Sequence, residues 1–493
     1  MALFLQYLGS LNIYYVWIGI LIIAIAITLL SVFIKKDFIK IAPVISIITI
    51  ILALIFIWTK WLGFNDVTTW LGNLAPEHLI VADRFTLVSW LLILISTALI
   101  ILISIPYLKA RDVKISEYYG MILFSIFGMA CLTASGNFLT LFIGIEIISI
   151  TSYVLIGFLR HRDTSNEASI KYFLLSIFAS AFLLMGIAFI FGSVGSLDFT
   201  IIHERIGDVL SSKGRHFCLF GIGLILTGFA FKIAAVPFHA WAPDVYDGAP
   251  TPITIFMATT VKISFFIAFL KIAIMILGTS SDLWINVIWV ISVITMCVGN
   301  LAAIVQDNIK RMLAYSSIAH TGYMLVVLPA ITSDPSGVNN AIMFYLIAYT
   351  FMTIAAFAVV IEMGLGKIEH TEINQLKGLG RKRPFLAACF SLSLLSLLGM
   401  PPTIGFFAKY YIFLTAIKSG FIWLTIIALF NTVISAFYYL RPIMVMYFSA
   451  DKEEPEFDLT NPAIVAVLTI TIITILYFGI FPKELLLIIS KSI

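Results

Sequence analysis

Residues 228–266 read GFAFKIAAVPFHAWAPDVYDGAPTPITIFMATTVKISFF. The segment begins and ends as an apolar helix of the kind that crosses membranes, yet it carries Lys232 and Lys262 inside its apolar parts. Between the two lysines the chain holds Pro237 and the turn DVYDGAP. Proline removes an amide donor and frees the carbonyl one turn earlier, so we expect a broken helix here. The segment therefore combines charge at membrane depth with an interrupted backbone.

The composition is that of a protein with many membrane-spanning helices. Of 493 residues, 61% are hydrophobic and 11% are charged, whereas a soluble domain carries roughly 25% charge. A bilayer core of about 30 Å requires about 20 apolar residues per helix. We expect an all-α polytopic fold, with an opening run too long for a cleavable signal peptide. The predicted spans lie near 12–34, 41–59, 80–106, 117–133, 138–159, 168–191, 217–238, 251–276, 283–305, 310–331, 338–362, 384–416 (interrupted), 421–447 and 461–482.

No motif for a redox cofactor or a nucleotide occurs in the sequence. The four cysteines lie in four separate apolar runs, without a CxxC or a Cys/His cluster, so iron–sulfur, haem c and zinc sites are unsupported. A Walker A loop and a Rossmann glycine fingerprint are also missing. The net charge of +4 is small and its basic residues lie in short loops, which indicates membrane topology rather than nucleic-acid binding. We expect no cofactor and no metal in this chain.

Lysine and arginine in alternate loops predict the orientation in the membrane. Sixteen of them fall on one side and seven on the other. Because cytoplasmic loops carry the excess of Lys and Arg, both termini are expected on the non-cytoplasmic side. The richer side holds Lys35, Lys36, Lys40, Lys109, Arg111, Lys114, Arg160, Arg162, Lys310, Arg311, Lys367, Lys377, Arg381, Lys382, Arg383 and Lys452. The other side holds Lys60, Arg205, Lys213, Arg215, Lys418, Lys483 and Lys491.

Four charged residues remain deep inside the predicted spans: Glu146, Lys232, Lys262 and Lys409. Each such charge costs about 2.5–3.5 kcal/mol on insertion scales, so four cost on the order of 10 kcal/mol. A structural interpretation pairs Glu146 with Lys232 and lets the other lysines reach the interface. Snorkelling suits Lys271, Arg84 and Arg441 near span ends, but it fails for central lysines. One acid facing three bases leaves amines that burial makes easier to deprotonate, and we favour a proton path.

A second break supports this interpretation. The stretch LLGMPPTIGFFAKYY places Pro401 and Pro402 shortly before Lys409. Non-helical backbone at membrane depth survives only against protein or water, and discontinuous helices build ion sites near the midplane of transporters. Two broken helices thus each carry a lysine near the break.

Three further residues are secondary candidates. His239 follows Pro237 at the first break, and His320 lies in the polar stretch AYSSIAHTGYM. Either histidine is a hydrogen-bonding structural residue or a proton relay. Lys171 follows Glu167 by four residues, which is the spacing of an end-of-helix ion pair, although the pair could also line an entrance.

At this point the residues resemble a known family. The stretches AVPFHAWAPDVYDGAPTPITIFMATTVK, NIKRMLAYSSIAHTGYML, SNEASIKYFLL and GMPPTIGFFAKYY are similar to subunit N of proton-pumping NADH–quinone oxidoreductase, respiratory complex I. The likeness runs from about residue 80 to 450. PDVYDGAPTP followed by MATTVK distinguishes subunit N from its paralogues L and M and from multisubunit Na⁺/H⁺ antiporters.

The resemblance implies an antiporter-like fold of 14 helices with two inverted five-helix repeats, helices 4–8 and 9–13, and broken helices 7 and 12. The corresponding domains are 1–110, 111–280, 281–450 and 451–493. Glu146 then matches the helix-5 glutamate, and Lys232, Lys262 and Lys409 match the lysines of helices 7, 8 and 12. Lys171, His239 and His320 fall where the family has polar residues.

The resemblance also implies a function and partners. The chain is expected to pass protons from Lys232 to Lys262 and Lys409, driven by redox chemistry in other subunits. NADH, FMN, iron–sulfur clusters and quinone are expected in those partner subunits, which include an M-type neighbour and small J/K-type subunits. A bacterial cytoplasmic membrane is preferred to a plastid thylakoid. The alternatives are a multisubunit cation/proton antiporter, a hydrogenase- or ferredoxin-linked complex, and a purely structural scaffold.

Overall fold

A computed structural model describes residues 14–33, 38–62, 79–113, 115–212, 214–277, 281–365, 369, 371–449 and 461–491. Of the basic residues that predict the orientation, Lys35, Lys36, Lys114, Lys213, Lys367 and Lys452 lie outside these ranges. The described part of the chain is helical, and its β-structure is confined to isolated bridges.

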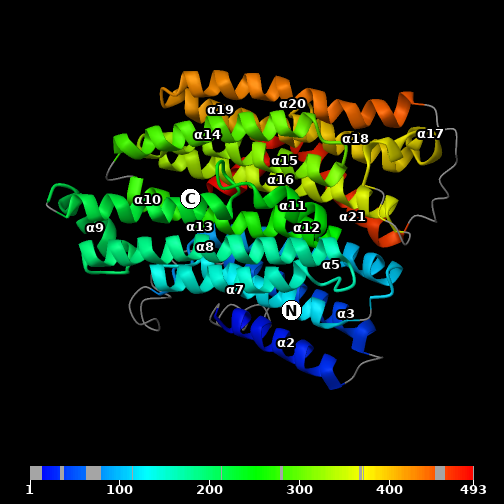
Figure 1. Cartoon of the computed structure of the whole chain (residues 1–493), viewed down its shortest axis with the longest axis horizontal. Helices are drawn as coiled ribbons and strands as arrows, with labels where there is room; N and C mark the ends of the chain where they lie inside the picture. The colour runs from blue at the N-terminus through cyan, green and yellow to red at the C-terminus, as the bar shows by residue number, and fades with distance from the viewer. Residues whose placement is uncertain are drawn as a thin grey trace.

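The helices lie side by side with their axes along the longest dimension of the molecule (Figure 1). Every predicted apolar run contains at least one of them. The long ones are α2 (Tyr14–Phe33), α3 (Phe38–Leu62), α5 (Arg84–Ala110), α6 (Glu117–Thr133), α7 (Phe138–Ile156), α8 (Asp163–Val194), α10 (Arg215–Lys232), α13 (Lys262–Leu277), α14 (Ser281–Ile304), α15 (Ile309–Leu325), α16 (Pro335–Met363), α18 (Pro384–Leu398), α19 (Ile404–Lys418), α20 (Ile422–Phe448) and α21 (Pro462–Ile480). Eleven helical segments of the described chain are long and apolar enough to cross a membrane.

Several short helices were not predicted from the sequence. They are α9 (Phe199–Leu210), α11 (Trp241–Gly248), α17 (Leu379–Lys382), α22 (Pro482–Ser490) and the 3₁₀ turn η3 (Ile373–Leu376), whereas α12 (Thr251–Phe256) and the 3₁₀ turn η2 (Leu328–Thr332) lie within predicted runs. Apolar run length detects helices that cross the bilayer, and it misses helices of one to three turns that lie beside it. A π-helical turn, η1 (Met257–Val261), also interrupts the eighth predicted run.

The core of the bundle is made of three nearly continuous helical paths. The path Thr251–Met275 and helix α16 are buried along their whole apolar windows, and Ile309–Thr332 is 94% buried. Helices α8, α14, α20 and α21 bury 33–39% of their windows. Their outer faces carry large apolar side chains, such as Phe178, Val433 and Phe448, which suits contact with lipid or with other subunits.

The first break lies between α10 and α11, at Ile233–Ala240. We expected the seventh span to continue to residue 238, but α10 ends at Lys232. Ala234 takes a positive φ of 57° and the Val236–Pro237 bond is cis. Side chains bind the backbone groups that the break frees: Trp241 donates to the Phe231 carbonyl at 3.0 Å and Thr321 to the Ile233 carbonyl at 2.9 Å. The break is therefore satisfied by protein, as the low dielectric at membrane depth demands.

The second break separates α18 from α19 at residues 399–403. Gly399 has a φ of 91°, a conformation that glycine adopts without a steric penalty. Its amide donates to the Leu395 carbonyl at 3.1 Å and the Met400 amide to the same carbonyl at 3.0 Å. The Pro401–Pro402 bond that follows is cis. Both breaks predicted from the prolines are present.

Candidate functional site

Lys232 is the last residue of α10 and its side chain is 5% exposed. Its Nζ donates to Ser149 Oγ on α7 at 2.8 Å and to Ser176 Oγ on α8 at 2.7 Å. The helix ends at this residue because Pro237 cannot donate to the Ile233 carbonyl. The amine therefore sits beside the break with two hydroxyl partners.

Glu146 lies on α7 one turn before Ser149, and its Oε1 accepts from Ser180 on α8 at 2.6 Å. Glu146 and Lys232 do not form a direct ion pair in the described part of the chain. Their partners Ser176 and Ser180 are four residues apart and share one face of α8. The acid and the amine thus face each other through a layer of serines rather than in contact.

Lys262 begins α13 directly after the π turn η1, and it is 4% exposed. Its Nζ donates to the Ser317 carbonyl at 2.8 Å, to Ser317 Oγ at 2.6 Å and to Thr321 Oγ1 at 3.0 Å. Thr321 is the residue that donates to the Ile233 carbonyl, one residue after Lys232. One hydroxyl therefore connects the first break to the central lysine.

Lys409 lies on α19 and is 5% exposed. Its Nζ donates to the Leu398 carbonyl at 2.8 Å, across the second break. A helix C-terminus carries a partial negative charge, so a cation is stabilised there. The amine also lies 4.6 Å from the centre of the Tyr323 ring, within the range of a cation–π interaction.

His320 occupies the space between the last two lysines. Its Nδ1 shares a hydrogen bond with Tyr345 at 2.6 Å and its Nε2 with Tyr439 at 3.0 Å. The imidazole packs 5.1 Å from the Tyr349 ring and 5.9 Å from the Tyr323 ring. Lys262 faces the Tyr349 ring at 5.3 Å, while Lys409 faces Tyr323. The structure thus brings both lysines to one buried histidine.

The other secondary candidates lie at the edge of this region. Lys171 pairs with Glu167 at 2.7 Å and also with Asp244 of α11 at 2.9 Å. A cavity of about 140 Å³ adjoins this group, and Asp244 also pairs with Arg311 at 2.9 Å. His239 lies in the first break, and its Nδ1 is buried without a hydrogen-bond partner among the described residues.

The three residues interpreted as snorkelling meet polar groups near helix ends. Lys271 donates to Thr86 Oγ1 at 2.8 Å, and Arg84 donates to the Lys491 carbonyl at 3.1 Å. Arg441 binds Asp307 and the Gln306 carbonyl. None of these contacts reaches the buried lysines.

Sequence reasoning missed the uncharged partners of the lysines. Hydroxyl groups from α7, α8 and α15 and tyrosines from α15, α16 and α20 line the path: Ser149, Ser176, Ser317, Thr321, Tyr323, Tyr345, Tyr349 and Tyr439. Only the polar start of α15 gave a signal in the sequence. Elsewhere, a hydroxyl in an apolar helix commonly bonds its own backbone, so its type says nothing about its partner.

Comparison with known proteins agrees with the fold. The family model described as NADH:quinone oxidoreductase/Mrp antiporter, TM matches residues 135–435, more than half of the chain. NADH-quinone oxidoreductase subunit N of Trichlorobacter lovleyi is 42% identical over 426 residues, which cover 86% of each chain.

Two solved structures share the architecture. A chain of respiratory complex I from Thermus thermophilus with bound aureothin superposes with a TM-score of 0.79 at 30% identity, covering 97% of this chain and 100% of that one. A chain of the membrane-bound sulfane sulfur reductase, an archaeal respiratory membrane complex, gives 0.85 at 25% identity, with 97% and 96% covered. On the identity and coverage of its relatives, the chain belongs to the family of NADH-quinone oxidoreductase subunit N.

Proposed function

We propose that the chain translocates protons in the membrane arm of an NADH:quinone oxidoreductase, along Glu146, Lys232, Lys262 and Lys409. The observation that carries the proposal is the burial of three amines in the centre of the bundle, each bound to neutral oxygen atoms rather than to a carboxylate. An amine held in this way can pass on its proton without separating a buried ion pair.

In this mechanism Lys232 takes a proton from the cytoplasmic side, and the charge of Glu146 holds it across the serine layer. Rearrangement in neighbouring subunits weakens that attraction and passes the proton towards Lys262. Thr321 supports this step, since it binds Lys262 and the carbonyl next to Lys232. Moving one charge against 100 mV takes about 2.3 kcal/mol, so the rearrangement has to weaken the attraction across the serine layer by at least about that amount.

The second step carries the proton from Lys262 to Lys409. His320 supports it, because tyrosines that face each lysine pack against the imidazole. Groups this close titrate together rather than singly. Lys171, with Asp244 and the adjoining cavity, is the proposed entrance on the cytoplasmic side.

We further propose 14 crossings and two inverted repeats, α6–α13 and α14–α20, within domains 1–110, 111–280, 281–450 and 451–493. Two asparagine caps support the repeat. Asn137 caps the second helix of the first unit and forms a bridge with Asp198, whereas Asn308 caps the second helix of the second unit and forms a bridge with Glu372. The same connection thus recurs between the corresponding loops of the two units.

The proposed setting is a bacterial cytoplasmic membrane, with both termini on the non-cytoplasmic side. M-type and J/K-type membrane subunits are the proposed neighbours. NADH, FMN, iron–sulfur clusters and quinone belong, in this proposal, to partner subunits. The chain itself acts as the non-redox part of the translocase.

A second candidate keeps the proton path and changes the electron donor. The likeness to a chain of the sulfane sulfur reductase supports it, because the same fold serves that respiratory complex. Purification of the complex and identification of its donor distinguish the two, and a complex that oxidises ferredoxin instead of NADH favours the second.

The decisive experiment compares the wild-type complex with Lys232→Ala in sealed vesicles. We expect NADH-driven, uncoupler-sensitive acidification to fall sharply while the subunits still co-purify. Lys418→Ala, a lysine at the end of α19, is the control and retains wild-type acidification. If Lys232→Ala acidifies as fast as wild type, the proposed path is wrong.

A further inference from the structure

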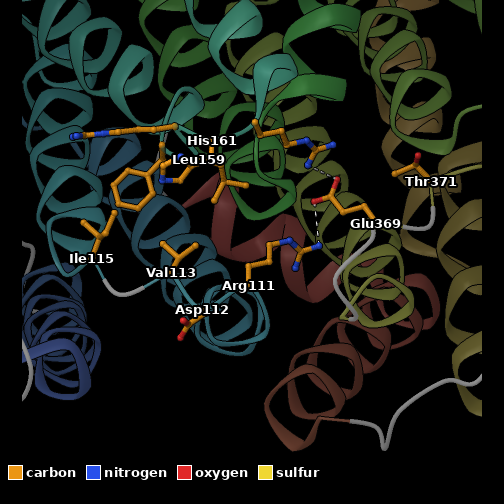
Figure 2. Close-up of a pocket in the computed structure, with 11 residues that line it drawn as sticks. Arg111, Asp112, Val113, Ile115, Leu159, His161, Glu369 and Thr371 are labelled. Atoms are coloured by element: carbon orange, nitrogen blue, oxygen red, sulfur yellow. Dashed lines mark hydrogen bonds and ion pairs between the residues drawn. The ribbon is translucent and has the colours of Figure 1, made fainter.

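A buried carboxylate outside the lysine path joins segments from both halves of the chain. Glu369 lies between α16 and η3, with a side chain 8% exposed. It forms ion pairs with Arg162 at 2.9 Å, Arg111 at 3.4 Å and Lys310 at 3.6 Å. Figure 2 shows Glu369 and Arg111 facing each other at the wall of a cavity of about 690 Å³. We call Glu369 and these three cations the Glu369 cluster.

The cluster fastens the turn that follows the broken helix. Glu369 Oε1 accepts from Thr251 Oγ1, the first residue of α12, at 3.2 Å. Lys310, fully buried at the start of α15, donates to the Ala249 carbonyl at 2.8 Å. Tyr107 of α5 donates to Glu369 at 2.5 Å and lies 3.4 Å from the Thr251 amide. The starts of α12 and α15 are therefore tied to one carboxylate.

The same two helical paths meet again at the central lysine. Lys262 lies eleven residues after Thr251, and its partner Thr321 lies eleven residues after Lys310. At 1.5 Å per residue the two contacts are about 16 Å apart along the axes. Only the first path contains a π turn, η1, between them. Because a π turn closes i→i+5 rings, the two paths do not advance in step, and side-chain contacts have to set their register.

We infer that Glu369 is a positioning residue that sets the register of α12–α13 against α15 and thereby holds the Lys262 amine at Ser317 and Thr321. This inference rests on the proposed function of Lys262. A slip of the two paths at Glu369 displaces Lys262 from its hydroxyl partners, and misplacement by about 1 Å can cost about 10²-fold in rate.

Glu369 acts as a fixed charge rather than as a proton carrier. Burial opposes its ionisation, but Lys310, Arg162 and the hydrogen bond from Tyr107 outweigh burial and lower the pKa of Glu369 to about 2. At neutral pH the carboxylate therefore stays charged, and its neighbours stay paired with it.

The test measures protons pumped per NADH oxidised by the assembled complex in vesicles. Glu369→Gln keeps the shape of the side chain and removes its charge. We expect this ratio to fall at least about twofold. The matched control is Glu372→Gln, the same change at an exposed position three residues later, with wild-type pumping expected.

A double mutant separates positioning from general damage. Ser317 lies seven residues after Lys310 of the Glu369 cluster, roughly 10 Å along α15. At this separation, two substitutions that act independently have effects on pumping that multiply. If Glu369 acts through the Lys262 contacts, Glu369→Gln with Ser317→Ala pumps no worse than the poorer single variant. The inference is wrong if the fraction of pumping that the double variant retains equals the product of the fractions that the two single variants retain. It is also wrong if Glu369→Gln pumps as wild type does.

Thr251→Val covers the case in which Glu369→Gln does not assemble. It removes the hydroxyl that Glu369 binds without leaving an unpaired charge. We expect a smaller loss with the same lack of additivity towards Ser317→Ala, and wild-type pumping by Thr251→Val overturns the inference. Lys262→Met, prepared in parallel, tests the proposed function separately. If Lys262→Met pumps normally, the proposed function is wrong. If Lys262→Met loses pumping while Thr251→Val pumps as wild type does, only the role of Glu369 is wrong.

Discussion

At the scale of single residues, the buried charges were predictable and their partners were not. Glu146, Lys232, Lys262 and Lys409 stand out because each charge in an apolar run costs several kcal/mol. Thr321 does not stand out, since threonine is common in apolar helices and usually bonds its own backbone. Yet this hydroxyl joins the first break to Lys262.

Thr321→Val tests that connection. Removing the hydroxyl leaves the buried Ile233 carbonyl unsatisfied, which destabilises the chain by about 1–3 kcal/mol. We also expect slower proton pumping per NADH in vesicles, since Lys262 loses one of its partners. Thr350→Val is the control, because that buried hydroxyl bonds only the Leu346 carbonyl of its own helix. Equal effects of the two variants on pumping contradict the role of Thr321.

The low pKa of Glu369 predicts an acid-sensitive contribution to stability. Its pKa in the folded chain, about 2, lies below the ordinary 4.5. The stabilisation is therefore complete above about pH 5 and disappears as the pH falls towards 2. We expect the difference in melting temperature between wild type and Glu369→Gln to narrow from about pH 6 to about pH 3. A difference that stays constant over this range is evidence that the carboxylate is not stabilised by its neighbours.

At the scale of elements, the sequence predicted where helices cross and where they break, but not their exact ends. Prolines marked both breaks because they cannot donate to a preceding carbonyl. The end of α10 at Lys232 was missed, since Ile233–Val236 are apolar and continue the run that the prediction followed. Pro237 leaves the Ile233 carbonyl without its helical donor, and side chains from α11 and α15 satisfy the freed carbonyls; such distant partners leave no local signal.

The two asparagine caps make a testable contribution to stability. Asn137 accepts from the Thr140 amide at 2.8 Å, and Asn308 accepts from the Lys310 amide at 2.8 Å. Loss of such a cap costs about 0.5–2 kcal/mol. We expect Asn137→Ala and Asn308→Ala each to lower the melting temperature of the complex. Asn308→Ala has the larger effect, because Asn308 also donates to Asp247 at 3.0 Å.

Asn137→Asp is the control, since it keeps the accepting oxygen and caps about as well as asparagine. Melting temperatures of the alanine variants that match wild type contradict the capping role.

At the scale of the whole molecule, the bundle has a sealed centre and an apolar exterior. Helix α16 is buried throughout its apolar window, while α20 is 39% buried. Hydropathy alone could not separate them, because both are long and apolar enough to cross a membrane. Which span lies in the centre depends on contacts between distant segments, and the sequence carries no pattern that reports them.

Two matched substitutions test this arrangement. Ala355 on α16 is fully buried and Val433 on α20 is 72% exposed. Ala355→Leu overpacks the centre and is expected to cost about 1–3 kcal/mol, with less assembled complex recovered from membranes. Val433→Phe adds at least as many carbon atoms at the exterior and leaves the yield unchanged. Equal yields of the two variants contradict the position of α16.

The bond from Thr321 to the first break has one more consequence. A threonine hydroxyl has a single hydrogen, and two carbonyl oxygens lie within its reach: Ile233 at 2.9 Å and Ser317 at 3.2 Å. If Ile233 withdraws, this hydrogen rotates onto the Ser317 oxygen, which already accepts from Lys262. A shift of the main chain beside Lys232 thus makes the Thr321 hydroxyl rotate. After the rotation this hydroxyl competes with Lys262 for the Ser317 carbonyl.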